Sequence, residues 1–386
     1  MPRTMLIAIW VRNTYFKQGK ANEDRLARLK AAVEKTAEIR KGVVTRQDWA
    51  KPEVIFIAPE YLFGRPTGEN WVDPKAWLGG KPLPNPVDPK RHRHLDEKDK
   101  DKIKGKLIAL SAKHREFLIV PGTIAWSVRV KDHPRLLQVA KNRVRLQPPG
   151  IVEGASPTDK LARLVSFTNL DARKARKPGA GPPLTNPEEE RLNNARLCLN
   201  TAFVLYGGDV KFVYSKQGDF YEVLAPCQPN HAYEVAIPGD KCGVFEIEGK
   251  WYGIEICFDH YCGVLHQVPP LQEPPLIHLI TSATVEVNPN NCVVAPGGYV
   301  ANAAAKPEDA GLWYNDSGTL KRVESPRWPY VPPPPPPAPS VGPIRLSRRG
   351  PRPPNLPPSE PWPPKSYKEY PDVAGSPLWV YRADVP

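Results

Sequence analysis

Short, uninterrupted apolar segments are the feature that most constrains how this chain folds. Residues 5–11 (MLIAIWV), 54–58 (VIFIA) and 117–120 (FLIV) contain apolar side chains only. A strand that is apolar on both sides is typical of a parallel sheet whose two faces are both covered. Between the first two segments, residues 22–42 carry leucine and valine at intervals of three and four, which is a helical pattern. Strand, helix and strand in this order predict an α/β fold.

Further along, the chain continues with a second helix and with β-hairpins. Ile103, Leu107 and Leu110 mark the apolar face of the helix. Apolar segments then flank two glycine-containing turns, at 207–209 and 249–250, and such turns between strand-like segments are typical of hairpins. The strands expected here are 201–206 with 211–214, 243–248 with 251–257, and a further buried strand at 275–280.

Proline divides the chain into two predicted parts. The chain has 49 prolines, among them the run Pro332–Pro337, and proline stays dense up to residue 364. This composition favours extended polyproline II structure or disorder over a packed core. We therefore expect one domain at 1–325, with a loop insertion at about 128–192, and a largely extended or disordered Pro-rich tail at 326–386. The tail is a candidate ligand for SH3-like or WW-like modules, and a plain spacer is an equal alternative.

Charge and cysteine content limit the kinds of partner and the cellular compartment that are expected for this chain. The formal net charge is +13, but the basic runs 91–94 and 173–177 fall in segments typical of loops, and no nucleic-acid-binding motif accompanies them. We therefore expect no nucleic acid partner. No apolar run approaches the roughly 20 residues of a helical membrane span, so no span is predicted. The six cysteines form no CxxC pair and no signal-peptide apolar region is present, which favours free thiols in a cytoplasmic setting.

Three reactive side chains follow predicted strands. Glu60 comes shortly after the strand that ends at Ala58, Lys216 closes the first hairpin, and Cys257 ends the second. In α/β proteins reactive groups gather at the carboxyl ends of strands, so these residues are candidates for a general base, an oxyanion-stabilising cation and a thiol nucleophile. Taken singly, each also fits an ordinary role as a loop glutamate, a solvated lysine or a buried structural cysteine.

Taken together, the segments around these residues resemble the signature segments of the nitrilase (carbon–nitrogen hydrolase) superfamily, in the same order. That family shows a glutamate after a strand, Asn-Thr before a hairpin, a lysine that closes the hairpin, and a Gly-x-x-x-Cys-x-Asp segment around the nucleophile. The resemblance covers roughly residues 4 to 320, with gaps. The matching segments are Phe56-Ile57-Ala58-Pro59-Glu60, Asn200-Thr201-Ala202-Phe203-Val204, Tyr214-Ser215-Lys216 and Gly253-Ile254-Glu255-Ile256-Cys257-Phe258-Asp259.

The resemblance implies a fold and a reaction. The implied fold is an α/β four-layer α-β-β-α sandwich, often dimerised through helices, so a homodimer is expected. The implied reaction is cleavage of a non-peptide C–N bond in a small amide-like or carbamoyl substrate. Cys257 would attack, Glu60 would accept the thiol proton, and Lys216 with the N–H of Phe258 would hold the oxyanion. Neither a metal nor an organic cofactor is expected.

Two positions near the site are less determined by the resemblance. The family carries a second glutamate between the lysine and the cysteine, and both Glu222 and Glu234 compete for this role, with a slight preference for Glu234. After the nucleophile segment the family often has arginine followed by Phe-Pro, whereas this chain has His260-Tyr261-Cys262. We expect His260 to lie beside the pocket and to influence the class of substrate.

Other functions fit parts of the same pattern. Nitrile hydrolysis and acyl transfer would use the same three residues; an amide is preferred to a nitrile because Cys257 precedes Phe-Asp and not Trp-Glu. A binding protein that works through its Pro-rich tail is a further alternative. A metal site is another, because ligand-type side chains gather within ten residues: Cys257, Asp259, His260, Cys262 and His266.

Overall fold

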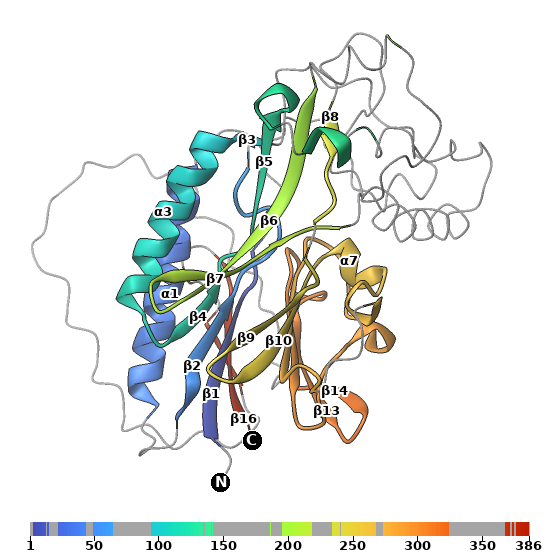
Figure 1. Ribbon diagram of the computed structural model, residues 1–386. Coiled ribbons are helices and arrows are strands. Elements are labelled where there is room, and N and C mark those ends of the chain that lie inside the picture. The colour runs from blue at the N-terminus through green and yellow to red at the C-terminus, as the bar shows by residue number, and fades with distance from the viewer. Residues whose placement is uncertain are drawn as a thin grey trace, which may run out of the picture.

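A computed structural model gives the arrangement of the chain (Figure 1). It describes residues 3–12, 14, 22–43, 49–64, 94–133, 136–139, 141, 186, 195–217, 234–239, 241–267, 273–323, 367–370, 373 and 376–385. The proline-dense segment at 332–364, which was expected to bind SH3-like or WW-like modules, and Glu222 therefore lie outside the described residues.

A large mixed sheet forms the centre of the described part of the chain. Its strands are β1 (Arg3–Trp10), β2 (Trp49–Ile57), β3 (Leu95–Asp96), β4 (Phe117–Val120), β5 (Thr123–Arg129), β6 (Arg196–Tyr206), β7 (Asp209–Ser215), β8 (Glu234–Ala236), β15 (Tyr367–Tyr370) and β16 (Leu378–Val385). The strand order is β15-β16-β1-β2-β4-β6-β5-β3, and β7 and β8 both pair with β6. The parallel pairs β1/β2 and β2/β4 confirm the α/β class predicted from the apolar segments.

A second sheet packs face to face on the first. Its strands are β9 (Val244–Ile247), β10 (Lys250–Ile256), β11 (Ile277–Thr281), β12 (Tyr299–Ala303), β13 (Gly311–Asp316) and β14 (Thr319–Arg322). They are arranged in the order β14-β13-β12-β11-β10-β9. The three central strands β10, β11 and β12 run parallel, so their carboxyl ends meet at one edge. Both predicted hairpins are confirmed, as β6/β7 and as β9/β10.

The strands are apolar throughout because both faces of the large sheet are covered. In β1, Met5, Ile7 and Ile9 join the core between the two sheets. The alternate residues of the same strand join a second core. This second core packs beneath the helices α1 (Asn22–Gly42) and α3 (Glu97–Lys113), which lie side by side on the outer face of the large sheet (Figure 1). The apolar face predicted for α3, at Ile103, Leu107 and Leu110, is buried there.

Short helical turns lie on the outer face of the second sheet. They are α7 (Phe258–Tyr261) and the 3-10 turns Leu265–Gln267 and Pro289–Asn291. Figure 1 shows α7 on the side of this sheet that faces away from the first. The α/β sandwich is thus confirmed, and in the described residues its fourth layer consists of single turns instead of long helices.

The end of the chain differs from the expected tail. We expected 326–386 to lie outside the domain, but β16 pairs with β1 along its whole length, from Arg3↔Val385 to Trp10↔Leu378. The reason is local: residues 378–385 contain no proline and place buried apolar side chains in the sheet. The domain therefore includes β16, and Arg3 and Val385 lie opposite each other at one end of the sheet (Figure 1).

Residues 128 and 129, at the start of the insertion expected at about 128–192, belong to a strand. Strand β5 continues to Arg129 and is followed by a 3-10 turn at Val130–Asp132. Most of the remaining segment lies outside the described residues. In the described parts of the chain, none of the helices combines the length and the apolar character that crossing a membrane requires.

Candidate active site

Glu60 lies at the carboxyl end of β2, between the two sheets. Its side chain is buried, and its backbone N–H donates to the carbonyl of Ser282 at 3.2 Å, which connects the two sheets. The turn is tight because Gly122, with φ of +78°, approaches it closely. A Cβ atom on Gly122 would lie 2.2 Å from the Pro59 carbonyl oxygen. Only glycine fits this position, so the path of the chain around Glu60 is tightly restricted.

Lys216 meets the Glu60 carboxylate in the interior. It follows β7 directly, and its backbone N–H donates to the Asn200 carbonyl at 2.8 Å. Its Nζ lies 2.9 Å from Glu60 Oε1, and both side chains are almost fully buried. The Asn200 side chain donates to the same oxygen, also at 2.9 Å. One carboxylate oxygen therefore receives a charged and a neutral donor in a low-dielectric setting, where such contacts are strong.

Cys257 sits in a strained turn between β10 and α7. Its φ of 49° and ψ of −102° are unusual for a residue that is not glycine. Its N–H donates to the Thr281 carbonyl at 2.9 Å, and the Thr281 hydroxyl donates to the Ala58 carbonyl at 2.9 Å. Thr281 thus fastens the nucleophile turn of one sheet to the end of β2 in the other, which is the strand that carries Glu60.

The environment of the Cys257 thiol links it to the other two residues. Burial, the Glu60 charge and a hydrogen bond to Glu60 raise the pKa of the thiol to about 12, whereas the Lys216 charge lowers it. Because these effects act over short distances, the thiol, the carboxylate and the ammonium share one site. At rest the thiol keeps its proton, and a neighbouring base is needed to remove it.

Asp259 holds the nucleophile turn against the end of β7 and the residues that follow it. Its carboxylate accepts from the Tyr214 hydroxyl at 2.8 Å and from the Gln217 N–H at 3.1 and 3.2 Å. Burial and the nearby Asp259 charge raise the pKa of Tyr214, so this hydroxyl remains a donor. Asp259 and Asn200 were visible in the sequence as parts of matching segments, but their partners depend on contacts between distant strands.

The remaining predicted site residues have different environments. Phe258 is buried and stacks on Tyr261, with ring centroids 5.8 Å apart. Glu234 begins β8, where its backbone pairs with that of Arg196, four residues before Asn200 on β6.

His260, expected to lie beside the pocket, has both ring nitrogens engaged within the protein. The side chain is fully buried, its Nδ1 lies 2.7 Å from Glu255 Oε2, and its Nε2 accepts from the Asn288 N–H at 3.0 Å. The ring lies under α7 on the outer face of the second sheet, and both nitrogens are occupied there. His260 looked like a pocket residue because it is close to Cys257 in sequence, but the turn of α7 directs it away.

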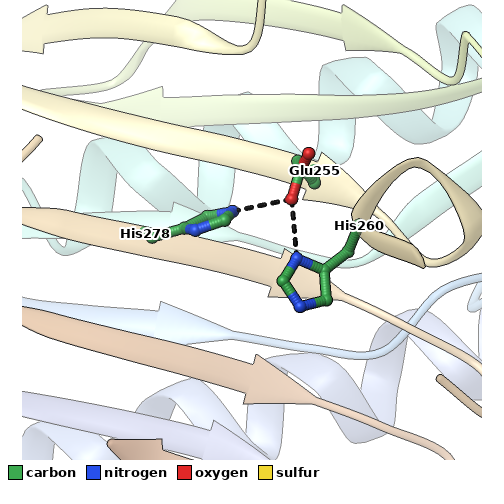
Figure 2. Close-up of side chains that lie close together, drawn as sticks. All are labelled: Glu255, His260 and His278. Carbon is green, nitrogen blue, oxygen red and sulfur yellow. Dashed lines mark hydrogen bonds and ion pairs between the residues drawn. The ribbon is translucent and has the colours of Figure 1, made fainter. Parts of the chain in front are cut away.

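The five-residue metal set proposed from the sequence does not converge on one point. Asp259 binds Tyr214, while His260 binds Glu255. Among the described side chains, a different group brings three ligand-type residues together: Glu255, His260 and His278 (Figure 2).

Comparisons with known proteins find similar solved structures but no match in sequence. No protein-family model matches the chain, and no curated protein matches it in sequence. Among solved structures it is similar to Nit3 from Saccharomyces cerevisiae, a member of branch 10 of the nitrilase superfamily, with 11% identity over 83% of each chain and a TM-score of 0.36. A mutant of the amidase from Nesterenkonia sp. AN1 in complex with butyramide shares 11% identity over 99% of this chain and 91% of its own, with a TM-score of 0.39.

A third similar structure is the glutamine-dependent NAD+ synthetase from Acinetobacter baumannii in complex with ADP. It shares 13% identity over 83% of this chain but 43% of its own, with a TM-score of 0.36. All three TM-scores lie below 0.5, so the assignment of the site rests on the strand order and the side-chain geometry of this chain.

Proposed function

We propose that this chain is a cysteine-dependent amide hydrolase, with Cys257 as nucleophile, Glu60 as general base and Lys216 as oxyanion partner. The observation that carries the proposal is the buried contact of Glu60 with Lys216 and Asn200, immediately beside the Cys257 thiol. A thiol, a carboxylate and an ammonium that converge between the carboxyl ends of strands form a complete set for acyl transfer.

In the first half of the reaction, Glu60 accepts the thiol proton as the sulfur attacks the carbonyl carbon of the amide. The carbonyl oxygen becomes an oxyanion, stabilised by the Lys216 ammonium and by the N–H of Phe258 at the start of α7. Glu60 then returns the proton to the amide nitrogen, the C–N bond breaks, and ammonia or an amine leaves. The product on the enzyme is a thioester at Cys257.

In the second half, Glu60 accepts a proton from water as the water oxygen attacks the thioester carbon. The same donors stabilise the second oxyanion. The C–S bond then breaks, a carboxylic acid is released, and the proton held by Glu60 returns to the thiol. Every step is a proton transfer or an acyl transfer, for which the three side chains are sufficient.

The raised pKa of Cys257 explains why a base must lie in contact with the thiol. A thiolate formed by simple ionisation would be rare at neutral pH. Transfer of the proton to Glu60 during attack avoids a buried net charge change, because the site has one negative charge before and after the transfer.

The proposal is tested by ammonia release from a panel of ω-amides, carbamoyl amino acids and simple nitriles. We expect release from an amide or carbamoyl compound, and its loss in Cys257→Ser and Lys216→Ala. Thr36→Val is the matched control, because Thr36 is a buried polar residue of α1 that donates to Ala32, on the far side of the large sheet. Release from nitriles alone, or transfer of the acyl group to an added amine in place of water, would contradict amide hydrolysis. Activity that survives in Cys257→Ser would contradict the nucleophile itself.

A further inference from the structure

A buried carboxylate and two imidazoles, those of Glu255, His260 and His278, lie close together (Figure 2). Glu255 belongs to β10, two residues before Cys257, and His260 belongs to α7, three residues after it. His278 comes from the neighbouring strand β11. All three side chains are fully buried. A buried charge is costly unless it is well paired, so the contacts of this cluster call for a physical account.

The Glu255 carboxylate is the centre of the cluster. Its Oε2 lies 2.7 Å from His260 Nδ1 and 3.0 Å from His278 Nε2, and its Oε1 accepts from the Leu265 N–H at 2.7 Å. Burial raises the pKa of Glu255, but the contacts with the two imidazoles outweigh burial and lower the pKa to about 2. The carboxylate is therefore ionised.

The other nitrogen of each imidazole accepts a backbone hydrogen bond. His260 Nε2 accepts from the Asn288 N–H at 3.0 Å, and His278 Nδ1 accepts from the Val293 N–H at 3.3 Å. A nitrogen that accepts carries no proton, so each neutral ring has its proton on the nitrogen that faces Glu255. No imidazole lone pair is then directed at the carboxylate. This arrangement favours a cluster held together by hydrogen bonds over a site that binds a metal ion between these residues.

The cluster holds α7 and the loop that covers it. Helix α7 has only four residues, too few to be stable by its own hydrogen bonds. Glu255 fixes α7 through His260, and His260 fixes the loop through Asn288. Asn291 adds hydrogen bonds from its side chain to the carbonyls of His260 and Tyr261, at 2.9 and 3.0 Å. On this face of the sheet, polar contacts hold the covering segments in place, a role that the packing of a long helix would otherwise have.

Cys257 depends on this support because its backbone is strained. A residue other than glycine keeps a positive φ only where its surroundings enforce it. The strain lies between two anchored points, Glu255 on the strand and His260 on α7. Loss of their contact would allow the turn to relax and would move the thiol and the first N–H of α7 away from the substrate.

We propose that Glu255, His260 and His278 are positioning residues that hold Cys257 and the N–H of Phe258 in the reactive geometry. This inference rests on the proposed amide hydrolase function. The imidazole nitrogens of His260 and His278 face Glu255 and the covering loop, so the two rings act on the nucleophile through the backbone and not as bases for the thiol.

The first test is Glu255→Gln, which keeps the size but removes the charge that pairs with two ring N–H groups. We expect kcat for the best amide of the panel to fall by about 10- to 100-fold with little change in KM, the size typical of losing a partner that orients an active-site group. The rate at which iodoacetamide alkylates Cys257 should fall as well, which gives a readout that needs no substrate.

A second test uses His260→Asn and His260→Ala, which remove the contact with Glu255 to different degrees. This test remains informative even if Glu255→Gln does not fold. Asparagine can place a donor near the position of Nδ1 and keep the contact with Glu255, whereas alanine removes it. We expect kcat to decrease in the order wild type, His260→Asn, His260→Ala. Thr36→Val, with a buried polar group lost in α1, is the control for a plain loss of stability and should leave kcat unchanged.

Several outcomes would overturn the inference. A lower melting temperature in Glu255→Gln with unchanged kcat and alkylation rate would mean a purely structural role. Stoichiometric zinc in the purified wild type that is lost in Glu255→Gln would mean a metal site. If the wild type releases no ammonia but is alkylated selectively at Cys257, amide hydrolysis fails, and the alkylation rates of the variants still decide this inference. If Cys257 shows no selectivity in the wild type, both proposals fail.

Discussion

At the scale of single residues, the chemistry of the site depends on one oxygen atom. Glu60 Oε1 accepts from Lys216 and from Asn200, so the carboxylate has a fixed direction toward the thiol. A hydrogen bond to a charged group is worth about 1.5 to 3 kcal/mol, which makes Asn200 the strongest candidate for a supporting role that the triad alone does not show.

Asn200→Ala tests this supporting role. Removal of the donor should leave Glu60 less well oriented and lower kcat about 10- to 100-fold in steady-state kinetics. Thr201→Val is the matched control, because Thr201 is the next residue of β6 and its hydroxyl contacts Trp126 and Ser215 instead of Glu60. If kcat fell equally in the two variants, the cause would be a general disturbance of β6 and not the lost hydrogen bond to Glu60.

Glu60→Gln should separate the catalytic activity of Cys257 from the ionisation of its thiol. The Glu60 charge raises the pKa of Cys257 and Lys216 lowers it, so removing the Glu60 charge should lower the thiol pKa. We expect hydrolysis to be lost, since the base is gone, while the pH midpoint of Cys257 alkylation moves to lower pH. Cys257→Ser identifies the alkylated residue by mass. A midpoint that moves upward would contradict the contact between the two groups.

The second glutamate is a further prediction at this scale. The resemblance leaves Glu222 and Glu234 as candidates, and with the slight preference drawn from the sequence we propose Glu234 as the substrate-positioning glutamate. Glu234→Gln should lower kcat/KM by about tenfold or more, while Glu222→Gln should stay close to the wild type. The opposite order would favour Glu222.

At the scale of elements, the last strand completes the large sheet. β16 pairs with β1 on one side while β2 pairs with β1 on the other, so the strand that opens the fold is held from both sides. Val380 lies opposite Ala8 in this ladder and is fully buried in the core beneath α1 and α3. The C-terminal residues thus stabilise the same sheet that carries Glu60.

Val380→Pro should destabilise the domain far more than Val380→Ala. Alanine removes two methyl groups and keeps the ladder, at a cost of about 2 kcal/mol. Proline also removes a backbone donor and is poorly tolerated inside a sheet, so we expect a further loss of several kcal/mol or failure to fold. Urea denaturation followed by circular dichroism measures both. Similar midpoints for the two variants would argue against β16 as an integral strand.

At the scale of the whole molecule, stability should depend on pH through the buried cluster of Glu255, His260 and His278. Burial is the main cause that lowers the pKa of His278 from its usual 6.5, so the unfolded chain binds a proton at a pH where the folded chain does not. The pKa of Glu255 is lowered from 4.5 to about 2. Both shifts favour unfolding in acid.

The free energy of unfolding should therefore decrease as the pH falls below about 6.5, first through His278 and then, below about 4.5, through Glu255. Above these values both contributions are fully present. Denaturation curves at a series of pH values measure the effect, and Glu255→Gln should flatten the acidic part. A wild-type profile that is level from neutral pH into the acidic range would contradict the buried, neutral state of His278.

The local features of this protein could be predicted from its residues alone. Apolar segments identified β1, β2, β4 and the hairpins, and three- and four-residue spacing identified α1 and α3, because hydrophobic periodicity is a property of neighbouring residues. The order of Glu60, Lys216 and Cys257 at strand ends was readable for the same reason. Proline density, by contrast, concealed β16, since composition averaged over a long tail hides one short strand without proline.

Which distant groups meet became clear from the three-dimensional packing of the sheets and turns. Asn200 reaches Glu60 across 140 positions, and β16 reaches β1 from the opposite end of the chain. The direction of His260, away from the thiol and toward Glu255, follows from the strained turn at Cys257 and the short helix after it. Such contacts depend on how sheets and turns pack in three dimensions, and no local pattern of residues encodes them.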